Sequence, residues 1–166
     1  MTQTEKIRLL KLLYQYRAMG FEYFKEYMPL SQKENFALPR NLDELKNAVL
    51  KCHLCSLAKS RKNVVFGVGN LKADIMFIGD NPGVSEDEIG EIFTGLSNEM
   101  LTKMIENVLH LKREDVYIAN IIKCKTPENR VPTPEEVSSC KPYLMQQIQT
   151  INPKIIVALG STSFHH

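Results

Sequence analysis

Three short apolar runs that alternate with helix-like stretches constrain the fold of this chain more than any other feature. The runs are residues 73–79, 116–122 and 154–160, and their composition is typical of buried strands. Helical patterns at 98–111 and 133–151 separate them. Strands that alternate with helices favour parallel pairing, with helices on both faces of the sheet. We therefore predict an α/β fold, a three-layer α/β/α sandwich with a central parallel sheet.

The beginning of the chain has a different pattern. Residues 4–27 carry apolar and aromatic side chains near helical spacing, so we expect one or two amphipathic helices. Such aromatic residues indicate a packed face, and a base-stacking surface is the alternative. Another helix is expected at 42–50, capped by Asn41. We divide the chain into a helical N-terminal extension, 1–40, and an α/β domain, 41–166.

Composition sets only broad limits on function. The 166 residues suit one domain, and a net charge of +2 permits nucleic-acid binding without arguing for it. No apolar run approaches the roughly 20 residues that cross a bilayer. The first residues lack the features of an export signal. We expect a cytoplasmic protein that does not bind membranes.

The four cysteines indicate a metal site. Cys52 and Cys55 form a close pair around His53, while Cys124 and Cys140 stand apart. Thiols of a reducing compartment are rarely a disulfide framework. A zinc ribbon would show a second close pair, so the spacing favours an iron–sulfur cluster over zinc. Two alternatives stay open, a zinc site and a simple burial of Cys124 and Cys140 as small hydrophobic residues. His53 is expected to be a bystander.

Polar residues follow the first two apolar runs. The turn Gly79-Asp80-Asn81-Pro82-Gly83 comes directly after the first run, and Asn120 lies near the end of the second. Ligands of parallel sheets bind at the carboxyl ends of the strands. Glycine and proline force a tight turn whose backbone amides can face a ligand. A purely structural role for this turn is an equal alternative.

A series of ordered motifs runs from about residue 42 to residue 162. It contains Cys52-x-x-Cys55, Val65-Phe66-Gly67, residues 73–87, Phe93-Thr94-Gly95, residues 116–120, Lys123-Cys124, residues 129–136 and Cys140-x-Pro142-Tyr143-Leu144. In this order the motifs resemble the family 4 uracil-DNA glycosylases. The resemblance implies hydrolysis of the N-glycosidic bond of uracil in DNA, as the first step of base-excision repair.

The same resemblance implies a cofactor and a substrate. Cys52, Cys55, Cys124 and Cys140 would hold a structural [4Fe-4S] cluster. The expected partner is uracil-containing DNA, single or double stranded, and the protein is expected to be a monomer. Four basic residues near the cluster loop are candidates for phosphate contacts or for solvated surface. They are Lys123, Lys125, Arg130 and Lys141.

Uracil recognition is assigned by the resemblance to three residues. Gly79 belongs to the uracil-binding turn, and Phe93 falls where an aromatic ring lies under the base, with a core role as its alternative. Asn120 falls where an amide reads the pyrimidine edge. One donor and one acceptor on that amide match O4 and N3–H of uracil, whereas cytosine presents the opposite pair.

The turn departs from the family pattern at two positions. Asp80 replaces a glutamate, and Asn81 replaces an alanine or glycine. Gly-x-Asn-Pro-Gly also resembles the turn of mismatch-specific and single-strand-selective glycosylases, in which that asparagine orients the attacking water. We predict that Asp80 and Asn81 are catalytic, with Asn81 taking part of the water-positioning role.

The family continues beyond the third apolar run with a helix, a strand and a His-Pro-Ser type loop. His165 and His166 lie too early to supply that loop, and they begin the next helix or come from cloning. The domain is therefore expected to lack its C-terminal strand and loop, to expose a sheet edge and to have reduced stability and impaired or absent activity. Two alternatives to an enzyme follow, a non-catalytic iron–sulfur nucleic-acid-binding module derived from the same fold and a zinc-stabilised nucleotide-binding domain.

Overall fold

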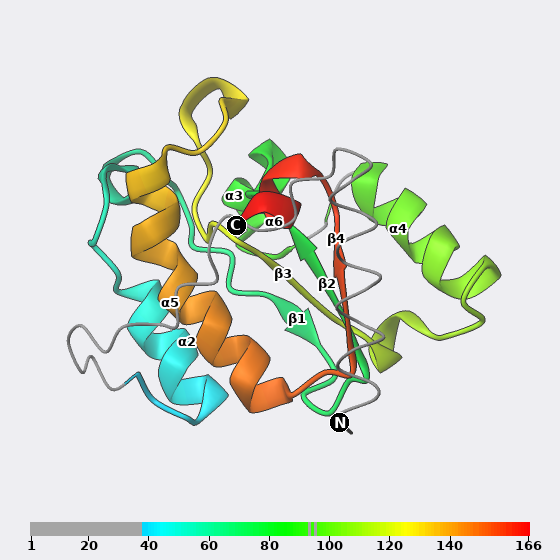
Figure 1. The fold of residues 1–166 in the computed structure, drawn as a ribbon. Coiled ribbons are helices and arrows are strands. Elements are labelled where there is room, and N and C mark those ends of the chain that lie inside the picture. The colour runs from blue at the N-terminus through cyan, green and yellow to red at the C-terminus, as the bar shows by residue number, and fades with distance from the viewer. Residues whose placement is uncertain (1–37, 93, 95) are drawn as a thin grey trace, which may run out of the picture. The chain divides into compact units, whose positions relative to one another are not determined.

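A four-stranded sheet forms the centre of the fold (Figure 1). The computed structural model describes residues 38–92, 94 and 96–166. The strands are β1 (Val68–Gly69), β2 (Ile75–Gly79), β3 (Tyr117–Asn120) and β4 (Ile155–Ala158), in the order β1-β3-β2-β4. Strands β2, β3 and β4 are parallel, which confirms the prediction for the three apolar runs. Strand β1 was not predicted, and it pairs antiparallel with β3.

Helices connect the strands as the sequence predicts. The described α-helices are α2 (Leu42–Leu50), α3 (Val84–Ile89), α4 (Leu96–Asn107), α5 (Pro134–Ile151) and α6 (Ser161–His165). Short 3-10 turns are η1 (Ser56–Lys59), η2 (Arg113–Asp115) and η3 (Pro127–Asn129). Helix α2 has the predicted bounds, because the Asn41 side chain accepts a 2.8 Å hydrogen bond from the Asp43 amide at its first turn.

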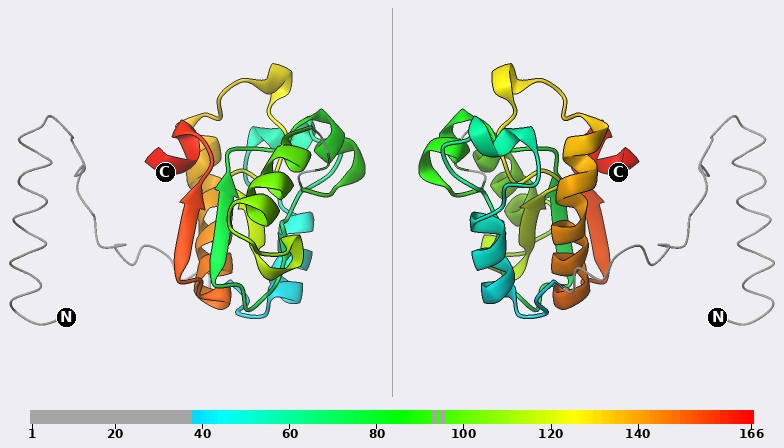
Figure 2. Two further views of the ribbon diagram at one scale, coloured as in Figure 1. Left: turned by 90° about the vertical axis from the view of Figure 1, so that its right-hand side faces the viewer. Right: turned by 90° about the vertical axis from the view of Figure 1, so that its left-hand side faces the viewer.

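The connections place helices on both faces of the sheet (Figures 1 and 2). Helix α4 joins β2 to β3, and α5 joins β3 to β4. Because β3 and β4 lie on opposite sides of β2, the two crossovers run in opposite directions. Crossovers of the same hand must then cover opposite faces. Helices α2 and α5 lie on one face and α4 on the other.

Alternating side chains of the strands fill two cores. Met76 and Ile78 pack with residues of α2 and α5, whereas Phe77, between them, packs with Leu101 and Ile105 of α4. This alternation is the period of two that a strand imposes. Burial of each such side chain stabilises the fold by roughly 1.5–3 kcal/mol. The predicted three-layer α/β/α sandwich is therefore confirmed.

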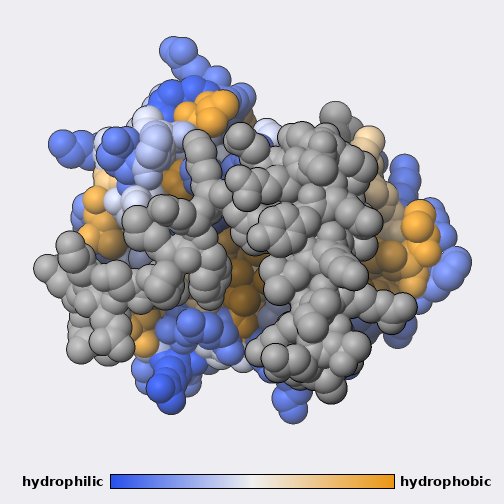
Figure 3. Space-filling model, in the orientation of Figure 1, coloured by the Kyte–Doolittle hydropathy of each residue, from blue (hydrophilic) through white to orange (hydrophobic). Residues whose placement is uncertain are grey.

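Strand β4 is an edge of the sheet among the described residues, since it pairs there with β2 alone. Ile155 and Ile156 of this strand are 54% and 47% exposed. Apolar atoms also appear at the right of Figure 3, over α4, where Met100 and Met104 are exposed. No helix in the described ranges is long and apolar enough to cross a membrane. The predicted helices of the extension, 1–40, lie almost wholly outside the described residues.

Candidate functional site

The carboxyl ends of β2 and β3 bring three of the predicted site residues together. Gly79 is the register partner of Asn120. Beyond this pair, the Ile121 amide donates to the Gly79 carbonyl at 2.9 Å and the Ile122 amide donates to the Asp80 carbonyl at 3.0 Å. The turn after β2 and the end of β3 therefore form one continuous edge.

Asn120 places a buried amide at this edge. The residue is only 2% exposed, and its side-chain nitrogen Nδ2 has no hydrogen-bond partner among the described residues. An unpaired buried donor costs about 1–3 kcal/mol of stability, so such groups are rare unless they serve a ligand. A base edge with an acceptor would satisfy this donor.

The Asp80 carboxylate contacts the segment that follows β4. Its oxygen Oδ1 accepts a 2.7 Å hydrogen bond from the backbone amide of Ser163. Its other oxygen lies close to Gly160, where an added Cβ would come within 3.0 Å. Gly160 also has φ of +116°, a conformation that favours glycine. Asp80 is therefore held between β2 and α6 at the same end of the sheet.

The four cysteines come together in space although they are scattered in sequence. All four line one pocket between α2, the start of α5 and the segment after β3; they are Cys52, Cys55, Cys124 and Cys140. None of them forms a disulfide. Within the described ranges, no group of three or more His, Cys, Asp or Glu side chains is arranged to hold a single metal ion. The alternative that Cys124 and Cys140 are only isolated core residues is thus not favoured, because both face the pocket of the close pair.

Positive groups and amides surround the sulfur atoms. Arg61 donates from Nη1 to Cys124 Sγ at 3.1 Å and from Nη2 to the Cys52 carbonyl at 2.6 Å. The Lys123 amide donates to Cys140 Sγ at 3.3 Å. Burial raises the pKa of Cys140 to about 11, and it also raises the pKa of Cys124, where Arg61 opposes it. Ionised thiolates in this pocket need a compensating positive charge.

Residues 66–166 match the family model of the uracil DNA glycosylase superfamily. The chain belongs to the uracil DNA glycosylase superfamily. It is 50% identical over 126 residues to the type-4 uracil-DNA glycosylase of Saccharolobus solfataricus, an alignment that covers 75% of this chain and 58% of that protein. The type-4 uracil-DNA glycosylase of Archaeoglobus fulgidus is 48% identical over 120 residues, which cover 72% of this chain and 60% of that protein.

A third relative gives the same result. The type-4 uracil-DNA glycosylase of Thermotoga maritima is 45% identical over 122 residues, which cover 74% of this chain and 63% of that protein. The predicted resemblance to family 4 is therefore confirmed. The chain spans about three fifths of the length of these curated relatives.

Lys123 is buried at the same edge of the sheet as Asn120 in this superfamily member. It was predicted to contact phosphates or to be solvated, but it is 1% exposed, so both predictions are wrong. Its ammonium group donates to the Asn120 carbonyl at 2.8 Å and to Gln147 Oε1 at 2.6 Å. Burial lowers the pKa of Lys123 to about 8, and the charges of Cys140 and Cys124 oppose that shift. Lysine is usually exposed, which is why the sequence did not predict that Lys123 is buried.

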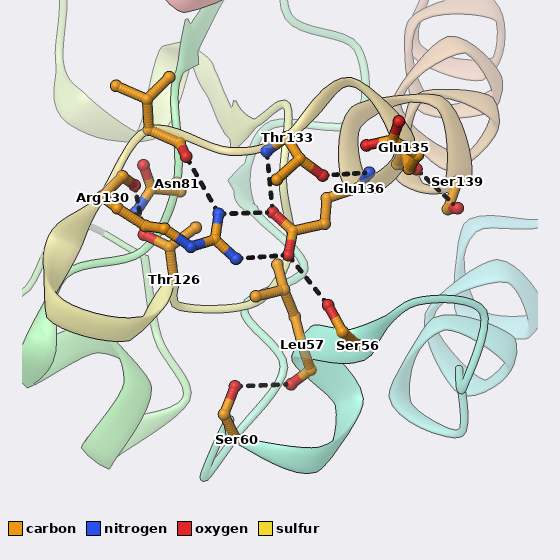
Figure 4. Close-up of polar contacts among 11 residues, drawn as sticks. Ser56, Leu57, Ser60, Asn81, Thr126, Arg130, Thr133, Glu135, Glu136 and Ser139 are labelled. Carbon is orange, nitrogen blue, oxygen red and sulfur yellow. Dashed lines mark hydrogen bonds and ion pairs between the residues drawn. The ribbon is translucent and has the colours of Figure 1, made fainter.

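Arg130 forms an ion pair inside the loop between Cys124 and Cys140 (Figure 4). Its Nη2 and Nη1 atoms donate to the two carboxylate oxygens of Glu136 at 2.7 and 2.9 Å. Glu136 is 3% exposed and also accepts from Ser56 Oγ at 3.0 Å. Arg130 holds the pKa of Glu136 down to about 2, against the effect of burial. The pair ties the loop to the first turn of α5.

The roles of all the predicted site residues stay predictions, including those of Gly79, Asn120 and the four cysteines. Phe93 lies outside the described residues. Its neighbour Thr94 has a buried hydroxyl oxygen without a hydrogen-bond partner in the described part of the chain. The catalytic roles of Asp80 and Asn81 stay predictions as well.

The other two basic residues near the cluster loop are Lys125 and Lys141. Lys125 donates to the Thr126 carbonyl at 3.2 Å, while Lys141 is exposed.

Proposed function

We propose that the protein to which this chain belongs is a DNA-repair glycosylase that hydrolyses the N-glycosidic bond of uracil in DNA. Its substrate is uracil-containing DNA, single or double stranded, and it acts as a monomer. Its cofactor is a [4Fe-4S] cluster held by Cys52, Cys55, Cys124 and Cys140. The similarity to three type-4 uracil-DNA glycosylases supports this proposal.

The unpaired amide nitrogen of Asn120 is the observation that carries the proposal. A donor at Nδ2 matches the O4 acceptor of uracil, and the oxygen of the same amide matches N3–H. Cytosine presents a donor and an acceptor in the opposite places. A buried site made for uracil therefore leaves cytosine with unpaired polar groups, which is a strong basis for rejection.

The turn after β2 supplies the groups that bond cleavage needs. Breaking the glycosidic bond develops positive charge on the sugar and negative charge on the departing uracil. A carboxylate near the sugar stabilises the first charge, and a positioned water completes the hydrolysis. Asp80 and Asn81 are the residues of this edge that can perform these two roles, since one is anionic and the other offers an amide oxygen. Phe93 supplies the stacking surface of the extruded base.

The cysteine pocket suits a cluster better than a single ion. A [4Fe-4S] cluster assigns each thiolate to a different iron, so its four ligands stand farther apart than the ligands of one ion. The four cysteines line one pocket, yet no described group is arranged to hold a single metal ion. Arg61 and Lys123 supply positive charge beside the thiolates. When bound, the cluster supplies a structural link among the segments that carry its four ligands.

The test is release of free uracil from a uracil-containing oligonucleotide by the anaerobically purified full-length protein. We expect excision from uracil but not from cytosine, and we expect Asn120→Ala to remove most of it. Asn107→Ala is the matched control, because Asn107 is an exposed asparagine at the end of α4 and has no role in the proposed site. Absence of excision by the cluster-loaded protein would refute the proposal. Retained DNA binding in that case would favour the non-catalytic module.

A further inference from the structure

We propose that Thr126 is a positioning residue that holds the side-chain amide of Asn81 in a single orientation, with its oxygen Oδ1 available to the attacking water. The inference rests on the proposed function, in which Asn81 positions that water. Thr126 lies two residues after Cys124 and is fully buried, at 0% exposed. Neither the sequence nor the resemblance assigned it a role.

The single hydroxyl proton of Thr126 decides the orientation. Thr126 Oγ1 lies 2.7 Å from the carbonyl oxygen of Arg130, and a carbonyl can only accept a hydrogen bond. The proton is therefore committed to Arg130. The same oxygen has only lone pairs left to face the Asn81 side chain, whose Nδ2 atom lies 3.3 Å away. The group of Asn81 that faces Thr126 must then be the NH2 group.

A second acceptor strengthens this selection. The Asn81 nitrogen Nδ2 also donates to the carbonyl oxygen of Pro82 at 3.2 Å. Rotation of the amide by half a turn would place Oδ1 against two acceptors and lose both hydrogen bonds. Figure 4 shows the Asn81 nitrogen directed at Thr126 and the amide oxygen directed away from it. The oxygen is thus the end of the side chain that neither of these two hydrogen bonds occupies.

Thr126 is itself fixed from the other side of the loop. Arg130, whose carbonyl takes the Thr126 proton, is bound in two places by the Glu136 carboxylate. Glu136 in turn accepts from Ser56, which directly follows Cys55 (Figure 4). A continuous series of hydrogen bonds therefore joins the cysteine segments to Asn81. An asparagine held in this way loses little freedom when it binds the water, which favours the reaction.

The experiment compares Thr126→Val with Thr126→Ser in the full-length, cluster-loaded protein. Valine has nearly the same shape without the hydroxyl, whereas serine keeps it. For Thr126→Val we expect the single-turnover excision rate constant to fall by about 10- to 100-fold, with the Kd for uracil-containing DNA unchanged. Thr126→Ser should keep a rate constant close to that of the wild-type protein. In an Asn81→Ala background, Thr126→Val should cause no further loss.

A second readout does not depend on activity. Protein labelled with 15N at asparagine gives a side-chain NH2 signal for Asn81, assigned by its absence from Asn81→Ala. Thr126→Val should shift this signal, and Thr126→Ser should leave it in place. An unchanged signal in Thr126→Val, or an equal rate loss with and without Asn81, would overturn the positioning role. A wild-type protein that excises no uracil would overturn the proposed function, while the amide signal would still report whether Thr126 holds Asn81.

Discussion

The buried ammonium group of Lys123 donates a 2.8 Å hydrogen bond to the backbone carbonyl of Asn120, the residue that carries the unpaired amide. Lys123 also lines the cysteine pocket, where its backbone amide donates to Cys140 Sγ at 3.3 Å. One residue therefore contacts both the strand edge that is proposed to read uracil and the pocket that is proposed to hold the cluster.

Replacement of Lys123 by methionine should destabilise the cluster-loaded protein more than the cluster-free protein. Both forms lose the two hydrogen bonds to Asn120 and Gln147, at a cost of about 1–3 kcal/mol for each group left unpaired. In the cluster-free form the substitution also removes a buried charge that has no carboxylate partner, which offsets part of this cost. In the loaded form it removes the cation that faces the thiolates, which adds to the cost. Urea unfolding of both forms measures the difference. Equal destabilisation of the two forms would show that Lys123 does not compensate the negative charge of the cluster and its thiolates.

Substitution of a single pocket cysteine should remove the cluster. Cys140→Ser is expected to lower bound iron and sulfide and to abolish the brown visible absorbance, because serine is a weak ligand for iron. His53→Ala is the control, since His53 is exposed and lies between two of the ligands in sequence. The His53→Ala protein should keep the wild-type iron content of about four atoms per chain. Iron loss in His53→Ala would show that the ligand set is misassigned.

The Arg130–Glu136 pair predicts a pH dependence of stability with a definite sign. Arg130 holds the pKa of Glu136 at about 2, below its ordinary value of 4.5. A carboxyl with a lowered pKa stabilises the fold fully above the unfolded value and loses that contribution as the pH falls toward the folded value. Glu136→Gln should therefore lower the free energy of unfolding clearly at about pH 6 and by less at about pH 3.

Glu135→Gln is the matched control for this pH dependence. Glu135 also lies in the first turn of α5, but it is exposed. Both substitutions remove one negative charge near the helix N-terminus, so their effects on the helix dipole are similar. The control should show little change in stability at either pH. A pH dependence as large as that of Glu136→Gln would assign the effect to the helix terminus and not to the ion pair.

Replacement of Gly69 in strand β1 should destabilise the fold. Gly69 has φ of +136°, and an added Cβ would lie 2.1 Å from the Val116 carbonyl oxygen. Gly69→Ala should lower the free energy of unfolding by at least about 1–3 kcal/mol, because the backbone must leave this conformation. Gly83→Ala is the control, since its nearest neighbour would be 3.8 Å away. A urea midpoint equal to that of the control would show that the β1 pairing is not needed for stability.

The sequence predicted the parallel strands and helix α2 because their signals are local. Short apolar runs, a helical period and the Asn41 cap each depend on neighbouring residues only. Strand β1 was missed because its two residues, Val68 and Gly69, are exposed and lie among glycines that indicate a turn. Its pairing with β3 comes from the tertiary fold, which no local pattern encodes.

The candidate site was predictable in part for a similar reason. The rule that ligands bind at the carboxyl ends of parallel strands brought Gly79, Asp80 and Asn120 together without knowledge of the fold. Lys123 and Arg130 have partners on α5, namely Gln147 and Glu136. The packing of α5 against the sheet determines those contacts. The sequence alone therefore predicted two exposed cations, whereas Lys123 is buried and Arg130 is paired with Glu136.

The positions of the four cysteines along the chain have a consequence for the unfolded protein. Between Cys55 and Cys124 lie β1, β2, α3, α4 and β3, so one cluster held by both residues would close a loop that contains three strands of the sheet. A cross-link over so long a loop lowers the entropy of the unfolded chain much as a disulfide does. Part of the stability conferred by the cluster would therefore arise in the denatured ensemble, where it would limit how far the sheet's strands can separate.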